Sequence, residues 1–289
     1  MTQRPTFWSS FRHVDAAADP IALLRYLDEF NALPAVAAGK RRSIELLGAA
    51  LGDGVLDLGC GAGDDTRALK EAVGPAGRAV GVDSSEHLIA EARERAGAAG
   101  VSVEYLVADA SELPFADDTF AACRCDRTLQ HLETPTRALA EMARVVSPGG
   151  RIVVSEAGNS LEGDATVHPD LLARARERFA PIGAKDGWFG AFVPLLLSRS
   201  GLRDVSVEER RDALPDYESA SRCFSIDAIA REMVQAGEST PDEAHEWLSG
   251  LRADFAEGRV QAIVRIFHFS GTSPPGDPAV VGQPSKSES

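Results

Sequence analysis

The amino-acid sequence predicts an α/β fold with a mostly parallel β-sheet. Short apolar segments that end near an acidic residue alternate with segments that have the periodicity of amphipathic helices. The first apolar segment, V-L-D-L at residues 55–58, runs directly into the turn G-C-G-A-G at residues 59–63. A strand that turns through glycines into a helix is typical of ligand-binding parallel sheets. We therefore expect a ligand site at the carboxyl ends of the strands.

The spacing of the glycines narrows the choice of ligand. Glycine permits positive φ and close approach of a ligand, and the next helix offers free N–H groups. A dinucleotide fingerprint would place its third glycine at Asp64, one residue after Gly63, and no Gly-Lys-Ser/Thr of a P-loop follows. The remaining motif is D-x-G-x-G-x-G, formed by Asp57, Gly59, Gly61 and Gly63.

A second strand and helix follow the glycine turn. The segment R-A-V-G-V-D at residues 78–83 predicts a strand that ends in Asp83. An acid at this position can accept hydrogen bonds from both hydroxyls of a ribose. Ser84 and Ser85 then supply N-cap chemistry for a helix that runs through Ala98.

The same alternation continues to the middle of the chain. Strands are predicted at residues 103–110, 117–127 and 151–156, with a helix at about residues 135–146. The turn S-P-G-G at residues 147–150 separates that helix from the last of these strands. The central half of the sheet is therefore expected to contain five strands.

These motifs together resemble those of the class I S-adenosylmethionine-dependent methyltransferases. The resemblance covers residues 55–156, and R-V-V-S-P-G-G-R is a common signature of that family. The whole chain looks like the small-molecule enzymes of the ubiquinone-biosynthesis-like group. The resemblance implies a Rossmann-like seven-stranded sheet, mostly parallel with an antiparallel last strand, and S-adenosylmethionine as cofactor.

The resemblance also implies roles for individual residues at the site. Asp57 would reach toward the amino group of the donor, Asp83 would bind the ribose with Ser84 beside it, and Asp109 would bind the adenine amino group. The N–H of Ala110 would face a ring nitrogen of the adenine. The segment D-R-T-L-Q-H-L at residues 126–132 would border the methyl-donor site, so the expected cofactor-binding residues also include Gly59, Gly61, Gly63, Asp126 and Arg127.

Several of these residues have simpler explanations that the sequence leaves open. The glycines could serve turn geometry alone, Asp57 could cap the turn, and Asp109 could simply end a strand. His131 is the best candidate for a general base, but a structural histidine is the favoured interpretation. His13 and His168 are weaker candidates for the same role. No cluster of carboxylates has the spacing of a metal site, so we expect no metal.

The rest of the chain predicts a lid and a cap around this core. We expect a helical lid at residues 1–52, the cofactor-binding core at residues 53–158, and cap helices with the last two strands at residues 159–270. Residues 271–289 are rich in Pro, Ser and Gly and are expected to be disordered.

Helices and strands are expected in both flanking regions. The predicted helices lie at residues 20–30, 38–51, 171–179, 225–236 and 240–257, and the predicted strands at residues 201–208 and 259–269. The aromatic residues Phe7, Trp8 and Phe11 either anchor the N-terminus or line the acceptor pocket. A second aromatic cluster surrounds Trp188.

Composition sets limits on partners and location. The net charge of −14 over 289 residues disfavours nucleic-acid substrates and anionic membrane surfaces. The spacing of the four cysteines fits neither a zinc site nor a disulfide framework. The sequence has no signal peptide and no apolar run long enough to cross a bilayer, so we expect a cytoplasmic, bacterial protein. A homodimer is left open.

The expected function is methyl transfer to a small-molecule acceptor, such as a secondary metabolite. The donor is already activated by its positive charge, so in-line positioning and exclusion of water are the main requirements. Two alternatives remain open. One is a cyclase or isomerase that uses the bound sulfonium for electrostatics, and the other is a catalytically silent partner protein.

Overall fold

The computed structural model describes residues 11, 13–17, 19–179 and 188–274. Within these residues, seven strands follow one another in the order β3-β2-β1-β4-β5-β8-β6, and β7 pairs with β8 outside this path. The strands are β1 Gly54–Leu58, β2 Arg78–Asp83, β3 Glu104–Val107, β4 Phe120–Asp126, β5 Val146–Ala157, β6 Ser160–Gly163, β7 Arg203–Ala213 and β8 Val260–Thr272. Strands β1 to β5 run parallel to one another, whereas β8 runs antiparallel to its neighbours β5, β6 and β7. The Rossmann-like fold with an antiparallel last strand is therefore confirmed, with β6 as an additional strand.

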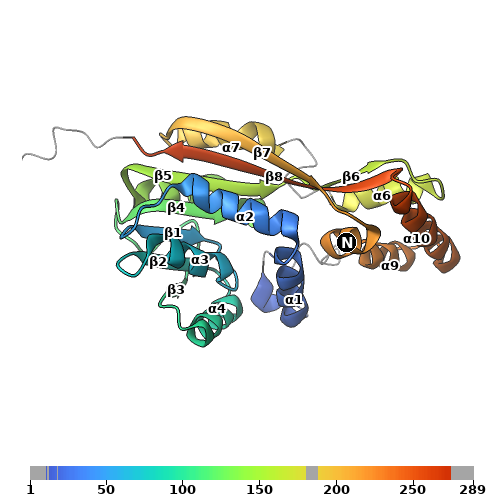
Figure 1. Ribbon diagram of the computed structural model, residues 1–289, viewed down its shortest axis with the longest axis horizontal. Helices are drawn as coiled ribbons and strands as arrows, with labels where there is room; N and C mark the ends of the chain where they lie inside the picture. Colours follow the sequence, from blue (N-terminus) through green and yellow to red (C-terminus); the bar gives the residue numbers. More distant parts are fainter. Residues whose placement is uncertain (1–10, 12, 18, 180–187, 275–289) are drawn as a thin grey trace, which may run out of the picture.

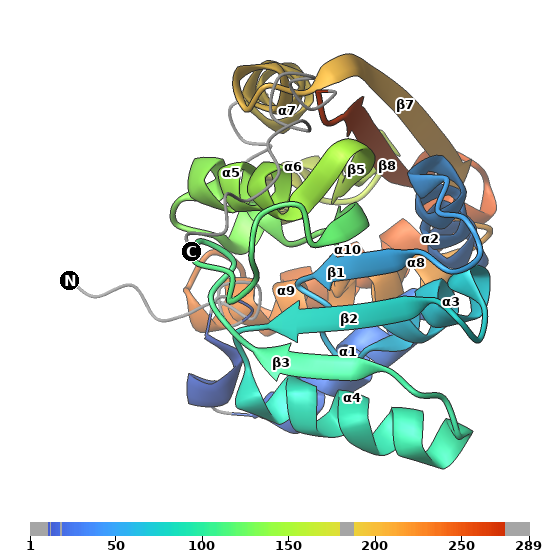
Figure 2. The same ribbon diagram turned by 90° about the vertical axis from the view of Figure 1, so that its left-hand side faces the viewer.

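Helices cover both faces of the sheet (Figure 2). The helices are α1 Pro20–Asn31, α2 Pro34–Leu47, α3 Asp64–Val73, α4 Glu86–Ala99, α5 Pro135–Val145, α6 Pro169–Phe179, α7 Trp188–Arg199, α8 Tyr217–Phe224, α9 Ile226–Gln235 and α10 Pro241–Ala256, with short 3-10 turns η2 Val14–Ala16 and η3 Leu129–His131. Helices α2, α3 and α4 pack on one face, while α5 and α7 pack on the other. This arrangement buries β1 and β4 on both sides, which explains why most of their residues are apolar.

Helix ends follow local sequence signals. Asp19 caps α1 by accepting a hydrogen bond from the N–H of Ala22 at 2.9 Å, and Pro20 occupies the first helical position. A capping box starts α10, because Thr240 and Glu243 each accept a hydrogen bond from the other's backbone N–H. Helix α2 ends where Gly48 adopts a left-handed conformation with φ of 63°.

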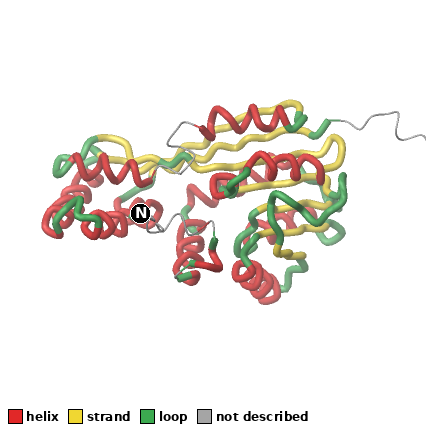
Figure 3. Tube along the Cα trace, turned by 180° about the vertical axis from the view of Figure 1, so that it is seen from behind, coloured by secondary structure: helices red, strands yellow, loops and turns green. Residues whose placement is uncertain are grey.

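A second lobe lies beside the sheet (Figures 1 and 3). The N-terminal half of β8 leaves the sheet edge, pairs with β6, and enters a group of helices formed by α6, α8, α9 and α10. Trp247 on α10 and Phe224 on α8 are fully buried in its hydrophobic core. The core also contains Phe30, Leu33 and Val36 from the N-terminal helices, so the lobe packs directly against the predicted lid.

Several elements differ from the prediction. Strand β6 and helix α8 were not expected. Strand β6 has only four residues, which carry little periodic signal. Helix α8 is separated from α9 only by Ser225, which has a left-handed conformation. Helix α2 begins at Pro34 and ends at Leu47, four residues before the predicted end at residue 51. Strand β8 continues to Thr272, past the expected start of the tail. Residues 275–289, Phe7 and Trp8 lie outside the described residues.

Two expectations from composition concern the cysteines and membrane-spanning helices. All four cysteines are free thiols, and Cys123, Cys125 and Cys223 are buried. Among the helices of the described residues, none combines the length and the apolar composition required to cross a bilayer.

The second lobe provides a stability test at Trp247. The side chain is fully buried, and its indole N–H has no hydrogen-bond partner within the described residues. We expect W247A to lower the free energy of unfolding by about 3–5 kcal/mol because it leaves a cavity. W247F should cost much less, because it keeps most of the ring volume and removes the unpaired donor. Denaturant unfolding of both variants measures the difference, and equal losses would contradict this account of the core.

Candidate functional site

The glycine turn lies between β1 and α3. Gly59, Gly61 and Gly63 all have positive φ, at 73°, 53° and 78°. A Cβ atom on Gly59 would collide with the Thr128 side chain, and one on Gly63 would collide with the hydroxyl of Tyr105. By contrast, no atom lies within 4 Å of the Cβ position of Gly61. Gly59 and Gly63 are therefore required by packing as well as by φ, while the backbone of Gly61 faces open space.

Asp83 is fastened to this turn. Its carboxylate accepts hydrogen bonds from the N–H of Gly61 and the N–H of Ser85, both at 3.0 Å. Burial raises the pKa of Asp83 above its ordinary value, partly offset by these backbone donors. The structure thus brings the acid at the end of β2 next to the open glycine, as expected of a ribose-binding pair.

The predicted adenine-binding residues lie after the next strand. One oxygen of Asp109 accepts hydrogen bonds from the N–H of Ser111 at 2.7 Å and from its hydroxyl at 2.8 Å. These bonds lower the pKa of Asp109, so it is ionised at neutral pH. Ala110 is buried beside it. Ser84 is exposed, and Ser85 is the residue that caps α4.

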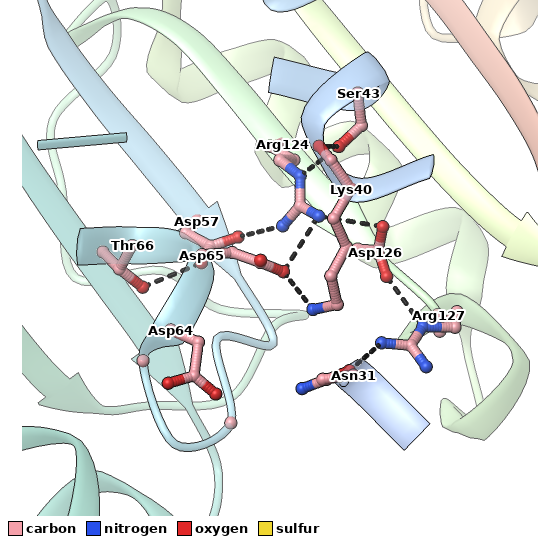
Figure 4. Close-up of polar contacts among 12 residues, drawn as sticks. Asn31, Lys40, Ser43, Asp57, Asp64, Asp65, Thr66, Arg124, Asp126 and Arg127 are labelled. Atoms are coloured by element: carbon pink, nitrogen blue, oxygen red, sulfur yellow. Dashed lines mark hydrogen bonds and ion pairs between the residues drawn. The ribbon is translucent and has the colours of Figure 1, made fainter. Parts of the chain in front are cut away.

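A buried cation organises the centre of the site (Figure 4). Arg124 on β4 is 1% exposed and bonds to Asp57 at 3.0 Å, Asp65 at 3.0 Å and Asp126 at 2.8 Å. Its Nε also donates to the hydroxyl of Ser43 on α2 at 2.7 Å. One guanidinium therefore connects β1, α3, β4 and α2.

Two further contacts complete this cluster around Arg124. Lys40 on α2 forms an ion pair with Asp65 at 2.5 Å. The hydroxyl of Thr66 donates to the second oxygen of Asp57 at 2.8 Å. Both carboxylate oxygens of Asp57 are thus engaged inside the protein, and the predicted direct contact between Asp57 and a ligand gains no support from this geometry.

The carboxylates of the cluster respond differently to the same surroundings. Burial tends to raise the pKa of each, but Arg124 and Lys40 hold the pKa of Asp65 well below its usual range. Arg124 and Arg127 likewise lower the pKa of Asp126 despite its burial. Burial dominates for Asp57, whose pKa is raised. Asp65 and Asp126 are therefore the carboxylates that carry the negative charge opposite Arg124.

Arg127 joins the cluster to the lid. Its Nε donates to Asp126 at 2.8 Å, and its Nη2 donates to Asn31 on α1 at 3.0 Å. The guanidinium also lies 4.6 Å from the ring centroid of Phe30. Arg127 has a φ of 52°, so a strained backbone holds it in this position. Arg127 thus pairs with an acid of the site.

A second contact fastens the lid beside Asp83. Asp15 accepts hydrogen bonds from the hydroxyl of Ser85 at 2.5 Å, the N–H of Glu86 at 2.8 Å and the N–H of His87 at 3.2 Å. These groups form the N-terminus of α4, where a carboxylate is favoured. The N-terminal helices are therefore held over the carboxyl ends of β1 and β2 at both sides of the glycine turn.

His131 lies in η3, close to this lid. Its ring is 5.8 Å from the Phe11 ring, and its Nε2 is 3.3 Å from Nε2 of Gln130. His168 instead pairs with Glu246 in the second lobe, which separates it from the glycine turn. His13 is exposed. Of the three histidines, His131 has the position that a general base would need, and its role stays a prediction.

Sequence reasoning missed the central residue of the site. Arg124 lies between Cys123 and Cys125 in an otherwise apolar strand, so strand alternation places it on the opposite face from those buried cysteines. A charge in a strand that is buried on both faces needs partners, and this signal could have identified Arg124. Asp65, Ser43 and Asn31 carry no comparable signal, because only the tertiary structure brings them together.

Arg124 provides a test of the cluster. We expect R124M to lower the free energy of unfolding at neutral pH by about 3–5 kcal/mol, because buried carboxylates lose their cation. Asp65 and Asp126 have lowered pKa values in the wild type, so their contribution is present above pH ~4 and is lost as pH falls below it. In R124M those pKa values should rise, so the deficit should shrink as pH is lowered from 8 to 5.

A second arginine, Arg42 on α2, provides a matched control for the loss of a cation. R42M removes a solvent-accessible cation on α2 that pairs with Glu45 and Glu208, and should destabilise the protein far less than R124M does, because water screens exposed ion pairs. Denaturant unfolding across pH compares the two variants. Equal costs, or a pH-independent deficit for R124M, would refute the role assigned to Arg124.

Known proteins resemble this chain in sequence. Residues 55–150 match the family model described as a methyltransferase domain. An uncharacterised 37.1 kDa protein in transposon TN4556 of Streptomyces fradiae is 33% identical over 231 residues, which cover 79% of this chain and 66% of that protein. The ubiquinone/menaquinone biosynthesis C-methyltransferase UbiE of Pseudomonas fluorescens is 40% identical over 119 residues, or 40% of this chain and 46% of the enzyme. The chain thus spans less than two thirds of the length of either relative.

A solved structure shares the fold. Phosphoethanolamine N-methyltransferase 2 of Haemonchus contortus superposes with a TM-score of 0.58 and 18% identity, over 92% of this chain and 60% of that one. At this identity the similarity shows that the two chains share a fold. The family model and the fold agree: residues 55–150 match a methyltransferase domain, within a Rossmann-like sheet of the kind found in a solved methyltransferase.

Proposed function

We propose that this protein transfers a methyl group from S-adenosylmethionine to a small-molecule acceptor. The observation that carries the proposal is the open backbone of Gly61 beside Asp83. A ribose can approach this backbone without meeting a side chain, and Asp83 retains free lone pairs after accepting one N–H at each oxygen. Asp109 extends the same edge of the sheet toward the adenine.

The residues present fit the donor along its whole length. Asp83 would hold the ribose, Asp109 and the N–H of Ala110 would hold the adenine, and the turn at Gly59–Gly63 would lie under the methionine part. Lys40 and Arg127 are cations of the cluster that Asp65 and Asp126 join to this turn, and either can attract the donor's carboxylate. When bound, S-adenosylmethionine supplies a methyl group on a positively charged sulfur.

The protein's own contribution is positioning and exclusion of water. Contacts of Asp15 with α4 and of Asn31 with Arg127 hold the N-terminal helices over the carboxyl edge of the sheet. An acceptor that binds beneath this lid would be held in line with the donor methyl group. Such alignment supplies most of the rate enhancement in a displacement whose leaving group is already activated.

We place the acceptor among small aromatic molecules, including secondary metabolites. Phe11, Tyr26 and Phe30 form a run of aromatic rings on the lid, with successive centroids 5.8 and 5.7 Å apart. The run lies beside His131 and Arg127, close to the predicted methyl-donor site. The relative named as a ubiquinone/menaquinone C-methyltransferase adds support for a ring-shaped acceptor.

Two measurements test the function. Titration calorimetry should detect binding of both S-adenosylmethionine and S-adenosylhomocysteine, and binding of neither would overturn the proposal. Incubation with methyl-labelled donor and a panel of small quinols and phenols should then give a labelled, extractable product. A product of unchanged mass and without label would favour the cyclase or isomerase alternative.

Asp83 provides a test of donor binding. D83N removes the negative charge that accepts the ribose hydroxyls, so we expect the donor dissociation constant to rise roughly tenfold to a hundredfold. Burial raises the pKa of Asp83, so wild-type affinity should fall as pH drops through that raised pKa, while D83N should lose this dependence. D242N on the exposed start of α10 is the control and should bind the donor as the wild type does. Unchanged affinity in D83N would refute the ribose assignment.

A further inference from the structure

Glu156 is a buried acid whose carboxylate forms no hydrogen bond with the described residues. It lies near the end of β5 and is 2% exposed. Burying an unpaired polar group costs free energy, and burying an unpaired charge costs far more. The carboxyl group at this position therefore lowers the stability of the fold, which points to a role other than structure.

The surroundings of Glu156 explain its ionisation state. Burial raises its pKa well above the ordinary value, and the nearby carboxylate of Asp126 raises it further. Arg127 and the backbone N–H groups of Leu129 and Gln130, which do not meet hydrogen-bond geometry with the carboxylate, act in the opposite direction but do not outweigh burial. Burial therefore favours the protonated form of Glu156 in the free protein.

Neighbouring strands do not satisfy this carboxyl group. Across β8, Glu156 is opposite Phe267, an apolar residue. Its chain neighbour Ser155 points to the other face and bonds to Nδ1 of His268 at 2.8 Å. Burial raises the pKa of Cys125 on β4 well above its ordinary value, and the nearby Glu156 raises it further, so that thiol stays neutral.

The order of the strands places Glu156 on the side of the site where the acceptor is expected to bind. The donor-binding groups proposed above follow the edge β3, β2 and β1, and β4 contributes Asp126 and Arg127 at its end. Strand β5 comes next, beyond β4, and the N–H of Arg127 donates to the carbonyl of Ser155 at 2.6 Å. A donor that spans β3 to β1 and presents its methyl group near the end of β4 would therefore direct that group toward β5.

We propose that Glu156 is the catalytic residue that accepts the proton of the acceptor molecule. This inference rests on the proposed methyltransferase function. Arrival of the sulfonium displaces the proton of Glu156 to solvent and leaves a carboxylate on the acceptor side. That carboxylate takes a proton from the hydroxyl or acidic C–H of the acceptor, and the freed electron pair attacks the methyl carbon. The sulfur–methyl bond breaks with its electrons on sulfur, which gives methylated acceptor, S-adenosylhomocysteine and protonated Glu156.

The coupling between sulfonium and Glu156 can be measured without knowing the acceptor. S-adenosylmethionine and S-adenosylhomocysteine differ by the methyl group and its charge. Titration calorimetry in two buffers of different ionisation enthalpy reports the protons released on binding of each. For the wild type near neutral pH, we expect more proton release with the charged ligand. If the sulfonium lowers the pKa of Glu156 by one unit, the preference for the charged ligand should rise about tenfold across that titration.

Variants separate Glu156 from other groups. E156Q should bind both ligands but lose the difference in proton release and the pH dependence of the preference. E133Q, an exposed change in the loop after η3, and H131N should keep both. E156D should keep an ionisable group and shift the midpoint of the titration, so it supplies the answer if E156Q does not fold.

The possible outcomes are distinct. Equal proton release with both ligands in the wild type, or a difference that survives in E156Q, would overturn the role of Glu156. Loss of the difference in H131N but not in E156Q would assign the coupling to His131 instead. If neither ligand binds the wild type, the proposed function itself fails.

Discussion

The site depends on one buried guanidinium. Arg124 is surrounded by carboxylates from β1, α3 and β4, and each of those groups would be costly to bury without it. Its contact with Ser43 extends the same cluster to α2. The first turn of α3, which carries Asp65, is therefore fixed relative to the ends of two strands. The geometry of the glycine turn follows, because that turn connects β1 to α3.

A second constraint is the length of β8. One half of this strand closes the sheet between β5 and β7, and the other half pairs with β6 inside the second lobe. The lobe therefore cannot move as a unit without disturbing a continuous strand. The N-terminal helices pack into the core of the lobe through Phe30, Leu33 and Val36, while Leu47 joins the core under the sheet. Lid, lobe and sheet are thus linked by shared packing.

The acids of the site fall into two groups with different surroundings. Asp65 and Asp126 lie against Arg124 and stay ionised, whereas Glu156 is buried without a cation of its own. The first group maintains structure, and the second provides a proton-binding group whose charge is sensitive to a nearby cation. A sulfonium donor is a cation, so the same edge of the sheet can hold both a fixed electrostatic frame and a group that responds to ligand.

The sequence by itself determined which segments form the strands and helices of the central sheet and where the glycine turn lies, because periodicity, glycine spacing and helix caps are local signals. Asp83 and Asp109 were singled out because each lies at or near the end of a predicted strand, and their expected roles stay predictions. The order of the strands in the sheet was decided by the tertiary structure. The tertiary structure also decided which side chains contact one another. The importance of Arg124, Asp65 and Glu156 is visible only in the folded protein, because the free energy of burying a charge depends on the groups that the fold places beside it.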